Sequence, residues 1–401
     1  MSWDYKTLNE LGTVSRGRSR HRPRNDNSLF GGKYPFVQTA DVKAANFYLT
    51  DYTETYNEKG LEQSRLWKAG TLCITIAANI ADTAILGIDA CFPDSIMGFV
   101  PYEGVSNAKF IKYAFDMLQR DIKQISQGTA QDNLSWQKLE TIKFPAPDIK
   151  IQKKIVEILG TFDDLIENNQ KQIKLLEEAA QRLYKEWFVD LRFPGYENCK
   201  IVDGVPEGWS KDRADNFFKI TIGKTPPRAE KQWFVDGSVG MPWLSISDMG
   251  NAGIYVFNTS EGLTSDAVQK YNMKVVPAGT VFVSFKLTIG RVAIAIKDMC
   301  TNEAIAHFCI ENDKLRAYTY CYLSNFEYDT LGNTSSISKA VNSKIIKAMP
   351  FVMPNDDTIK KFSNVVDPIL NEIKVKQEIC NELIEARDRL LPKLMSEEVE
   401  V

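Results

Sequence analysis

An internal duplication constrains the fold of this chain more than any other feature of its sequence. Residues 69–100 align with residues 278–309 at a constant offset of 209, and ten of the 32 aligned positions are identical. Elsewhere the offset drifts only to 207 or 206, as where Pro35 aligns with Pro242. Self-similarity at a fixed spacing is the signature of a repeated structural unit. The 401 residues are therefore predicted to form two diverged copies of one module.

Both copies carry the same succession of short apolar runs. Runs rich in β-branched residues and flanked by turn residues predict strands, which we place at 34–39, 71–77, 83–88, 242–246, 280–285 and 292–296. A short helix follows in each copy, at 107–122 and 315–327. The copies diverge most in four segments that we predict to be loops and insertions, at 19–33, 43–66, 225–239 and 250–275.

A long helix ends each copy. Core-like residues recur there with alternating steps of four and three, from Ile155 to Trp187 and again from Phe362 onwards. This spacing is typical of a coiled-coil seam, and it favours a helix paired with another helix over a helix buried on a globular body. Pro368 and Pro392 are expected to interrupt the second helix.

These patterns together predict an α+β fold with four parts. Two mixed α/β domains occupy residues 1–150 and 195–356. Two long helices occupy residues 151–190 and 357–396, one after each domain.

Side chains typical of metal sites and nucleophilic catalysis are scarce. The sequence has two histidines and seven cysteines, and no two cysteines form a Cys-x-x-Cys pair. A zinc site or a histidine-based triad is therefore not expected. Gly223-Lys224-Thr225 resembles the end of a phosphate-binding loop, but Phe218 stands where that loop requires glycine. We predict that the chain binds no metal or cofactor and catalyses no reaction on its own.

Charge and hydropathy narrow the class of protein and its location. The 49 basic and 52 acidic residues give a net charge of −3, which excludes a polybasic nucleic-acid binder but allows a local basic site. The first residues show no basic segment followed by an apolar run, so we expect no signal peptide. The most apolar stretch, Leu72–Ile88, is too short and polar to span a bilayer. We therefore expect a cytoplasmic protein.

Five arginines within nine residues form the strongest candidate site. Arg16, Arg18, Arg20, Arg22 and Arg24 recur at period two, which in an extended segment places all five guanidinium groups on one side. Arginine binds phosphates and guanine edges bidentately. The run therefore predicts a DNA contact, and a mobile, solvated basic loop is the alternative.

The second copy holds a weaker set of candidates. Its arginine-run equivalent begins at Gly223, which aligns with Gly17. Asn79 of the first copy lies nearly where cations flank a predicted turn of the second, and different polar groups on one scaffold position are what two different base readers would show. Ordinary surface cations would also fit. The further predicted DNA contacts are Asn79, Lys224, Arg228, Lys231, Lys286 and Arg291.

Several segments recur in a fixed order and carry a family resemblance. They are Gly223-Lys224-Thr225-Pro226, Pro242-Trp243-Leu244-Ser245-Ile246-Ser247-Asp248, the Ala-Gly-Thr starts at 69–71 and 278–280, Asn133-Leu134-Ser135, Phe144-Pro145-Ala146-Pro147, and Leu183-Tyr184-Lys185-Glu186-Trp187-Phe188. With the duplication, the chain resembles the specificity subunits of Type I restriction–modification systems over essentially its whole length.

The resemblance implies a function as well as a fold. Two target recognition domains would each read one half of an asymmetric bipartite site in double-stranded DNA, and two long antiparallel helices would hold the domains apart. Two modification subunits would dock on this chain and methylate adenine with S-adenosylmethionine. Restriction subunits would add translocation and cleavage driven by ATP with Mg²⁺. The setting implied is the cytoplasm of a bacterium or archaeon.

Antiparallel helices allow a prediction of their register. If the helices pair about a pseudo-two-fold axis, Asn169 and Lys376 meet at the centre of the seam, where a buried polar pair would fix the register. The apolar contacts expected in that register are Phe162–Leu383, Leu176–Ile369, Ile155–Leu390 and Leu183–Phe362.

Two other functions stay open at this point. The chain could be a coiled-coil assembly protein without a role on DNA, or the specificity subunit of a stand-alone modification system. Binding of DNA in a gel-shift assay with the partner methyltransferase separates the first of these from a DNA reader.

Overall fold

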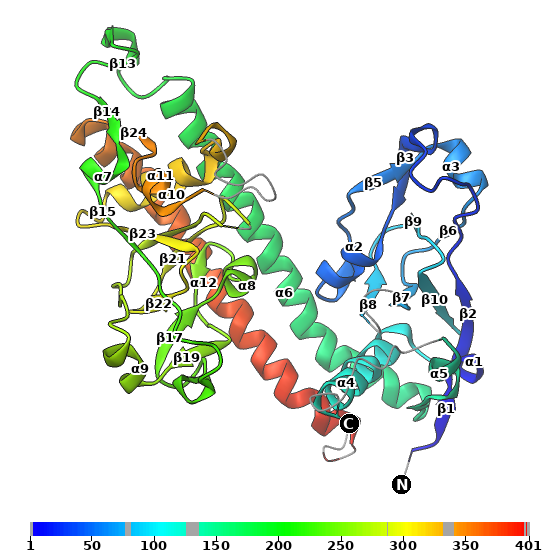
Figure 1. Cartoon of the computed structure of the whole chain (residues 1–401). Helices are drawn as coiled ribbons and strands as arrows, with labels where there is room; N and C mark the ends of the chain where they lie inside the picture. Colours follow the sequence, from blue (N-terminus) through cyan, green and yellow to red (C-terminus); the bar gives the residue numbers. More distant parts are fainter. Residues whose placement is uncertain are drawn as a thin grey trace. The chain divides into compact units, whose positions relative to one another are not determined.

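The computed structural model describes residues 3–76, 82–125, 136–286, 288–331, 341–396 and 398. The chain divides into two compact units (Figure 1). Unit 1 comprises Met1–Glu167 and Glu382–Val401, and unit 2 comprises Asn168–Asn381. Both units combine helices with sheets, as the α+β prediction requires.

A five-stranded sheet forms the centre of unit 1, with the strand order β2-β10-β7-β8-β4. Every residue of β7 and β8 is buried, because both faces of these strands are covered. Strands covered on both faces are continuous apolar runs rather than alternating ones. The strands are β2 (Gly12–Arg16), β4 (Tyr48–Leu49), β7 (Leu72–Thr75), β8 (Thr83–Leu86) and β10 (Ile96–Pro101).

Unit 1 also contains a four-stranded sheet and a two-stranded ribbon. The sheet has the order β5-β3-β9-β6, with β3 (Phe30–Phe36), β5 (Glu54–Tyr56), β6 (Leu66–Trp67) and β9 (Ala90–Cys91). The ribbon pairs β1 (Tyr5–Thr7) with β11 (Lys143–Pro145). The short helices are α1 (Leu8–Leu11), α2 (Thr39–Ala44), α3 (Glu58–Glu62), α4 (Ala108–Ile125), α5 (Trp136–Thr141) and the 3-10 turn Asn27–Leu29.

Unit 2 repeats the five-stranded sheet with the order β15-β23-β20-β21-β18. Its strands are β15 (Lys219–Ile222), β18 (Tyr255–Val256), β20 (Val281–Ser284), β21 (Val292–Ala295) and β23 (Ile305–Cys309). A four-stranded sheet has the order β16-β19-β17-β22, with β16 (Phe234–Asp236), β17 (Met241–Leu244), β19 (Glu261–Leu263) and β22 (Cys300–Thr301).

Ribbons and short helices complete unit 2. The ribbons pair β12 (Ile201–Val202) with β13 (Val205–Pro206), and β14 (Ser210–Arg213) with β24 (Pro350–Met353). The helices are α7 (Ala214–Phe217), α8 (Ile246–Asn251), α9 (Ser265–Lys270), α10 (Leu315–Asn325) and α11 (Ser343–Lys347), with 3-10 turns at Tyr196–Asn198, Lys231–Trp233 and Tyr328–Leu331.

Strand register confirms the duplication. In unit 1, β3 pairs in parallel with β9 through Phe36 and Cys91. In unit 2, β17 pairs in parallel with β22 through Trp243 and Cys300. These partners are related by the offsets of 207 and 209 that the sequence shows. Both five-stranded sheets also run through equivalent strands in the same order.

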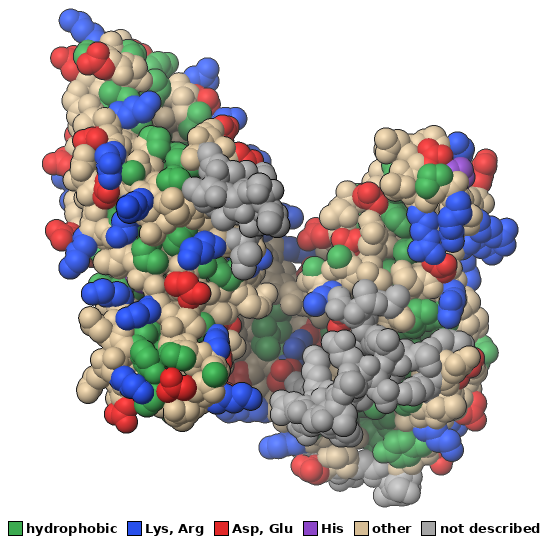
Figure 2. Space-filling model, in the orientation of Figure 1, with side chains coloured by type: hydrophobic (Ala, Val, Ile, Leu, Met, Phe, Trp, Pro, Cys, Tyr) green, Lys and Arg blue, Asp and Glu red, His purple; other side chains and the backbone are tan. Residues whose placement is uncertain are grey.

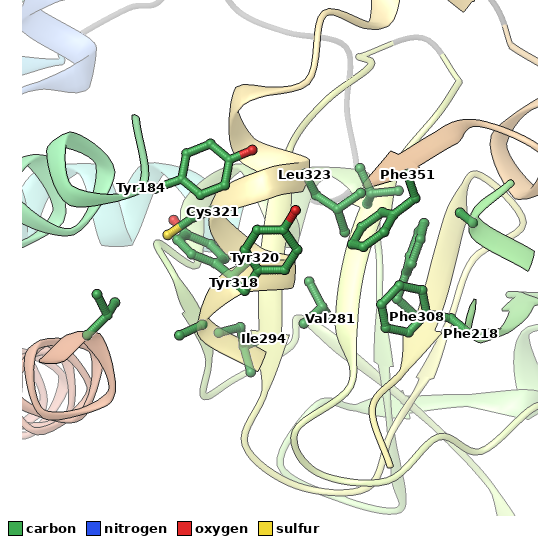
Figure 3. Close-up of a cluster of buried hydrophobic side chains, with 14 of the residues drawn as sticks. Tyr184, Phe218, Val281, Ile294, Phe308, Tyr318, Tyr320, Cys321, Leu323 and Phe351 are labelled. Carbon is green, nitrogen blue, oxygen red and sulfur yellow. The ribbon is translucent and has the colours of Figure 1, made fainter. Parts of the chain in front are cut away.

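Aromatic side chains fill the core of unit 2 between the five-stranded sheet and α10 (Figure 3). The sheet contributes Val281, Ile294 and Phe308, and all three are buried. Residues from α10, the long helix α6 (Ile149–Tyr184) and the flanking segments close the cluster, namely Tyr184, Phe218, Tyr318, Tyr320, Cys321, Leu323 and Phe351. Helix α4 covers the corresponding sheet of unit 1 with Phe110, Ile111, Tyr113 and Phe115.

Two long helices are present, as the seam spacing predicts. They are α6 (Ile149–Tyr184), which continues into a π-helical turn at Lys185–Val189, and α12 (Asp356–Met395). The expected interruption at Pro368 and Pro392 is wrong, because α12 continues through both prolines. Pro368 is exposed, so the carbonyl that loses its backbone partner can bind water.

The helices run antiparallel, because early α6 meets late α12. In unit 1, Arg387 Nη1 lies 2.6 Å from Asp163 Oδ1, and the Asp163 side chain is only 1% exposed. The Tyr113 hydroxyl also donates a hydrogen bond to this carboxylate. Burial raises the pKa of Asp163, and the bonds from Tyr113 and Arg387 oppose that rise.

The helix-pairing residues lie on buried or half-buried helix faces. Asn169 is 9% exposed, and the half-buried Lys376 forms an ion pair with Glu372 of its own helix. In unit 2, the Phe362 ring lies 5.7 Å from the Trp187 ring and 4.9 Å from the Phe188 ring, centroid to centroid. The predicted contacts of the seam, including Asn169 opposite Lys376, stay a prediction.

The prediction that the divergent segments are loops is wrong for three of the four. Segment 43–66 contains β4, β5 and α3, segment 225–239 contains β16, and segment 250–275 contains β18, β19 and α9. Strands of two or three residues are too short to give a periodic signal in the sequence. Among the helices in the described ranges, none has the length and apolar character that a membrane crossing requires.

Candidate nucleic-acid interface

The arginine run begins at the end of β2 and continues into an irregular segment. Arg16, Arg18 and Arg20 are exposed, and the intervening Gly17 and Ser19 are buried. Across the described part of the chain, none of these three guanidinium groups forms an ion pair or a side-chain hydrogen bond. They present three uncompensated positive charges to solvent.

Helix α3 and its C-terminal flank hold the backbone of this segment in place. The Gln63 side-chain oxygen accepts hydrogen bonds from the backbone N–H of Arg20 at 2.6 Å and of His21 at 3.0 Å. The Ser64 hydroxyl donates to the Arg18 carbonyl at 2.8 Å. The segment is therefore anchored, which argues against the alternative of a mobile loop.

The last two arginines of the run turn back to the protein. The Arg22 guanidinium donates to the carbonyls of Ser19 and His21, at 2.7 and 2.8 Å. Arg24 donates two hydrogen bonds to the Asp94 carboxylate, at 2.8 and 2.9 Å. The prediction that all five guanidinium groups share one side is therefore wrong for these two, because the chain bends and turns over residues 21–25. Figure 2 shows Lys and Arg side chains gathered beside a histidine on unit 1.

A cavity of about 710 Å³ adjoins the arginine run in unit 1. Three aromatic rings line this cavity, and the Phe36 and Tyr56 rings stack with their centroids 4.1 Å apart. Amide and hydroxyl groups, which can read base edges, line much of the rest. The lining residues are Ser19, Arg24, Asn25, Asn27, Phe30, Gly31, Phe36, Gln38, Thr39, Thr53, Glu54, Thr55, Tyr56, Pro93 and Ser95.

Two candidates of unit 2, Arg228 and Lys224, contact the indole of Trp243. The Arg228 guanidinium lies 4.5 Å from this ring, and it also forms an ion pair with Glu261 at 2.7 Å. Lys224 is exposed, and its ammonium donates to the Tyr271 carbonyl at 2.6 Å. Lys231 is exposed on the 3-10 turn Lys231–Trp233. Arg228 is thus partly neutralised, whereas Lys224 keeps its charge.

The remaining candidates of unit 2 are Lys286, whose charge acts on Glu303, and Arg291, which contacts α8. Burial opposes ionisation of Glu303, but a hydrogen bond from Thr225 and the charges of Lys286 and Arg228 hold its pKa below the usual value. Arg291 donates to the Ile246 carbonyl at 2.8 Å, so it stabilises α8. Asn79, the remaining candidate of the first copy, lies outside the described residues.

Sequence reasoning missed two cations that stack on aromatic rings. The Arg65 guanidinium lies 3.8 Å from the Trp67 ring, and its Nη1 donates to the Ser15 hydroxyl at 3.0 Å. Lys270 lies 4.5 Å from the Trp233 ring. Basic residues close to aromatic ones in the sequence were the available signal. Within the described ranges, no cluster of His, Cys, Asp and Glu is suited to hold a metal ion.

The duplicated modules, with different exposed cations on one strand order, define a class of two-domain proteins that share a frame and differ at the surface. The sequence matches the family model described as "Type I restriction modification DNA specificity domain" over residues 1–178 and again over residues 206–385. The chain belongs to this family.

Relatives match over almost the full length of the chain. The Type I restriction enzyme MjaIX specificity subunit of Methanocaldococcus jannaschii is 26% identical over 417 residues, covering 100% of this chain and 94% of that protein. The Type I restriction enzyme HindI specificity subunit of Haemophilus influenzae is 23% identical over 468 residues, covering 97% and 98%.

A solved structure shares the fold. The crystal structure of the Type I restriction–modification system S subunit from M. genitalium superposes with a TM-score of 0.55 at 14% sequence identity. The match covers 98% of this chain and 96% of that one. This likeness supports the two-module fold with long helices.

Proposed function

We propose that this chain is the DNA-reading, non-catalytic subunit of a Type I restriction–modification complex. Unit 1 contacts one half of an asymmetric bipartite site in double-stranded DNA, and unit 2 contacts the other half. Two modification subunits dock on the chain and methylate adenine, and restriction subunits cleave foreign DNA. S-adenosylmethionine, ATP and Mg²⁺ bind to those partner subunits in the cytoplasm.

One observation carries this proposal. Two sheets of the same strand order carry different exposed polar groups, with Arg16, Arg18 and Arg20 on unit 1 and Lys224 and Lys231 on unit 2. A duplicated frame with diverged surfaces suits two different half-sites, because side chains at base edges determine which sequence is bound.

Unit 1 offers a matched test within one run of arginines. The complex with its modification subunits is assembled with Arg16→Ala/Arg20→Ala or with Arg22→Ala/Arg24→Ala in this chain. The first variant loses two outward-facing cations, so its affinity for a duplex containing the methylated site should fall by about 1–3 kcal/mol per lost contact. The second removes groups that already bind the protein, so affinity should change much less.

Fluorescence anisotropy at moderate salt measures both affinities, and thermal melting checks that both variants fold. Equal affinity of the two double variants and the wild type would contradict the placement of DNA at this surface. A wild-type complex that binds no duplex would instead favour an assembly protein without a role on DNA.

A further inference from the structure

Each unit contains a buried glycine followed by an exposed cation at the end of an edge strand of its five-stranded sheet. In unit 1 these residues are Gly17 and Arg18, which follow β2. In unit 2 they are Gly223 and Lys224, which follow β15. We call these two dipeptides, with the backbone that holds them, the basic clamps.

Two backbone hydrogen bonds hold the clamp of unit 1. Gly17 N–H donates to the Ile96 carbonyl at 2.9 Å, and Arg18 N–H donates to the Phe92 carbonyl at 3.0 Å. A methyl group on Gly17 would overlap the carbonyl oxygens of Phe92 and Pro93. The close approach of the two backbones therefore requires glycine at this position.

The clamp of unit 2 repeats this geometry. Gly223 N–H donates to the Ile305 carbonyl at 3.1 Å, and Lys224 N–H donates to the Thr301 carbonyl at 2.9 Å. A methyl group on Gly223 would overlap the carbonyl oxygens of Thr301 and Asn302. All acceptors lie 209 residues after their unit 1 counterparts, and both donors lie 206 residues after theirs.

A third bond fixes each cation from the other side of its peptide. The Ser64 hydroxyl donates to the Arg18 carbonyl at 2.8 Å, and the Trp243 indole N–H donates to the Lys224 carbonyl at 3.1 Å. These two donors come from different places in their modules. Ser64 lies between α3 and β6, and Trp243 lies within β17. The position of the cation is thus held in both copies although the supporting side chains have diverged.

The identity of the cation distinguishes two kinds of DNA contact. Where a base edge is bound bidentately, the planar fork of Arg and the point charge of Lys are not interchangeable. A phosphate accepts either, as a fork or as a point charge. Arg18 and Lys224 differ in shape but agree in charge and in backbone position. A phosphate suits both residues, because each half-site presents phosphates whatever its base sequence.

We infer that Arg18 and Lys224 contact the phosphate backbone at equivalent places in the two half-sites, and that they set the position of each unit on the duplex without reading bases. This inference rests on the proposed function, and it assigns the reading of bases to other, diverged groups. Lys224 spends one of its three donor hydrogens on the Tyr271 carbonyl, so two are left for a phosphate.

The test uses the complex with its modification subunits and a duplex containing the methylated site mapped in host DNA. Arg18→Ala and Lys224→Ala should each weaken binding by about tenfold, as expected for loss of a hydrogen bond to a charged group. Each should also reduce the slope of log K against log salt concentration by about 0.9, because one fewer counterion is released. The methylated sequence should not change in either half.

Charge-preserving and remote variants sharpen the result. Arg18→Lys and Lys224→Arg should retain the wild-type salt slope. Lys143→Ala on β11 and Lys211→Ala on β14, exposed lysines of the equivalent ribbons, should leave affinity unchanged. A changed half-site in any clamp variant would identify that residue as a base reader, and an unchanged slope would exclude the phosphate contact. Either result overturns the inference but leaves the proposed function standing, whereas a wild-type complex that ignores DNA overturns both.

Discussion

The two modules solve the same packing problem with different side chains. In unit 1, the Trp67 indole stacks on the Phe92 ring with centroids 4.8 Å apart and an interplanar angle of 18°. The indole also covers Gly98 so closely that a methyl group there would overlap it. The position between the two sheets is thus filled by one large apolar group lying over a glycine.

At the equivalent positions, 209 residues later, unit 2 has Val276, Thr301 and His307. Backbone pairing confirms the equivalence, because Val276 pairs with Met299 as Trp67 pairs with Ala90. The valine is much smaller than the indole, and the imidazole of His307 fills the place above β23 instead. His307 is fully buried, and its two ring nitrogens lie 2.9 Å from the Thr221 hydroxyl and 2.7 Å from the Thr301 hydroxyl.

This difference shows which parts of a module are free to diverge. A large side chain and a glycine in one copy become a small side chain and an imidazole in the other, so the filled volume is kept, as cores require. Phe92 and Thr301 differ completely as side chains, yet both use the backbone carbonyl to hold a basic clamp. The backbone frame is shared, and the chemistry of the side chains is local to each unit.

Trp67→Ala is expected to have the largest effect, and this effect should be confined to unit 1. Truncation of a buried aromatic costs about 3–5 kcal/mol, and Gly98 offers no side chain that could fill the space. Amide hydrogen exchange should therefore accelerate in β9 and β10 of unit 1 while the amides of β22 and β23 in unit 2 stay protected. Val276→Ala is the matched control and should have a smaller effect, confined to unit 2. Equal acceleration in both units after Trp67→Ala would show that the modules do not hold their sheets together independently.

Acid should destabilise unit 2 through His307, whereas Trp67→Ala destabilises unit 1. Burial lowers the pKa of His307 from 6.5 to about 4. The unfolded chain then binds a proton that the folded unit 2 does not, so stability is complete above pH 6.5 and falls as the pH drops from 6.5 towards 4. The full shift corresponds to about 3 kcal/mol. Unit 1 has glycine at this position and lacks that contribution.

Denaturation followed between pH 7 and pH 4.5 measures this loss, with NMR titration of the imidazole as a direct check. His307→Gln keeps a hydrogen-bonding group near the two threonines and does not titrate, so it should remove the acid-dependent part for unit 2. An imidazole that titrates near pH 6.5 in the folded protein would contradict the account.

The frame could be predicted from the sequence because duplication is a long-range signal. Ten identities placed the strands of both sheets in correspondence, and the four-three spacing located both long helices. The expected break at Pro368 failed because proline weakens a helix without always ending it, and this proline faces solvent.

The candidate interface was harder to predict because its contacts join residues distant in sequence. Arg24 is neutralised by Asp94, seventy positions later, and Arg228 by Glu261. Period two correctly described the alternation from residue 16 to residue 20, in which Arg16, Arg18 and Arg20 are exposed and the residues between them are buried. The sequence also could not predict that Val276 and His307 replace the contacting pair Trp67 and Gly98, because neither copy alone shows that the two positions touch.

Independence of the two modules is tested most directly by a chimera. Residues 1–150 are replaced by the first module of another family member, and the chain is expressed with its modification subunits. Long-read sequencing of host DNA then maps the methylated adenines. The account predicts that one half of the bipartite site changes and the other half is retained, because each unit carries its own contacts on a shared frame. A change in both halves would contradict it.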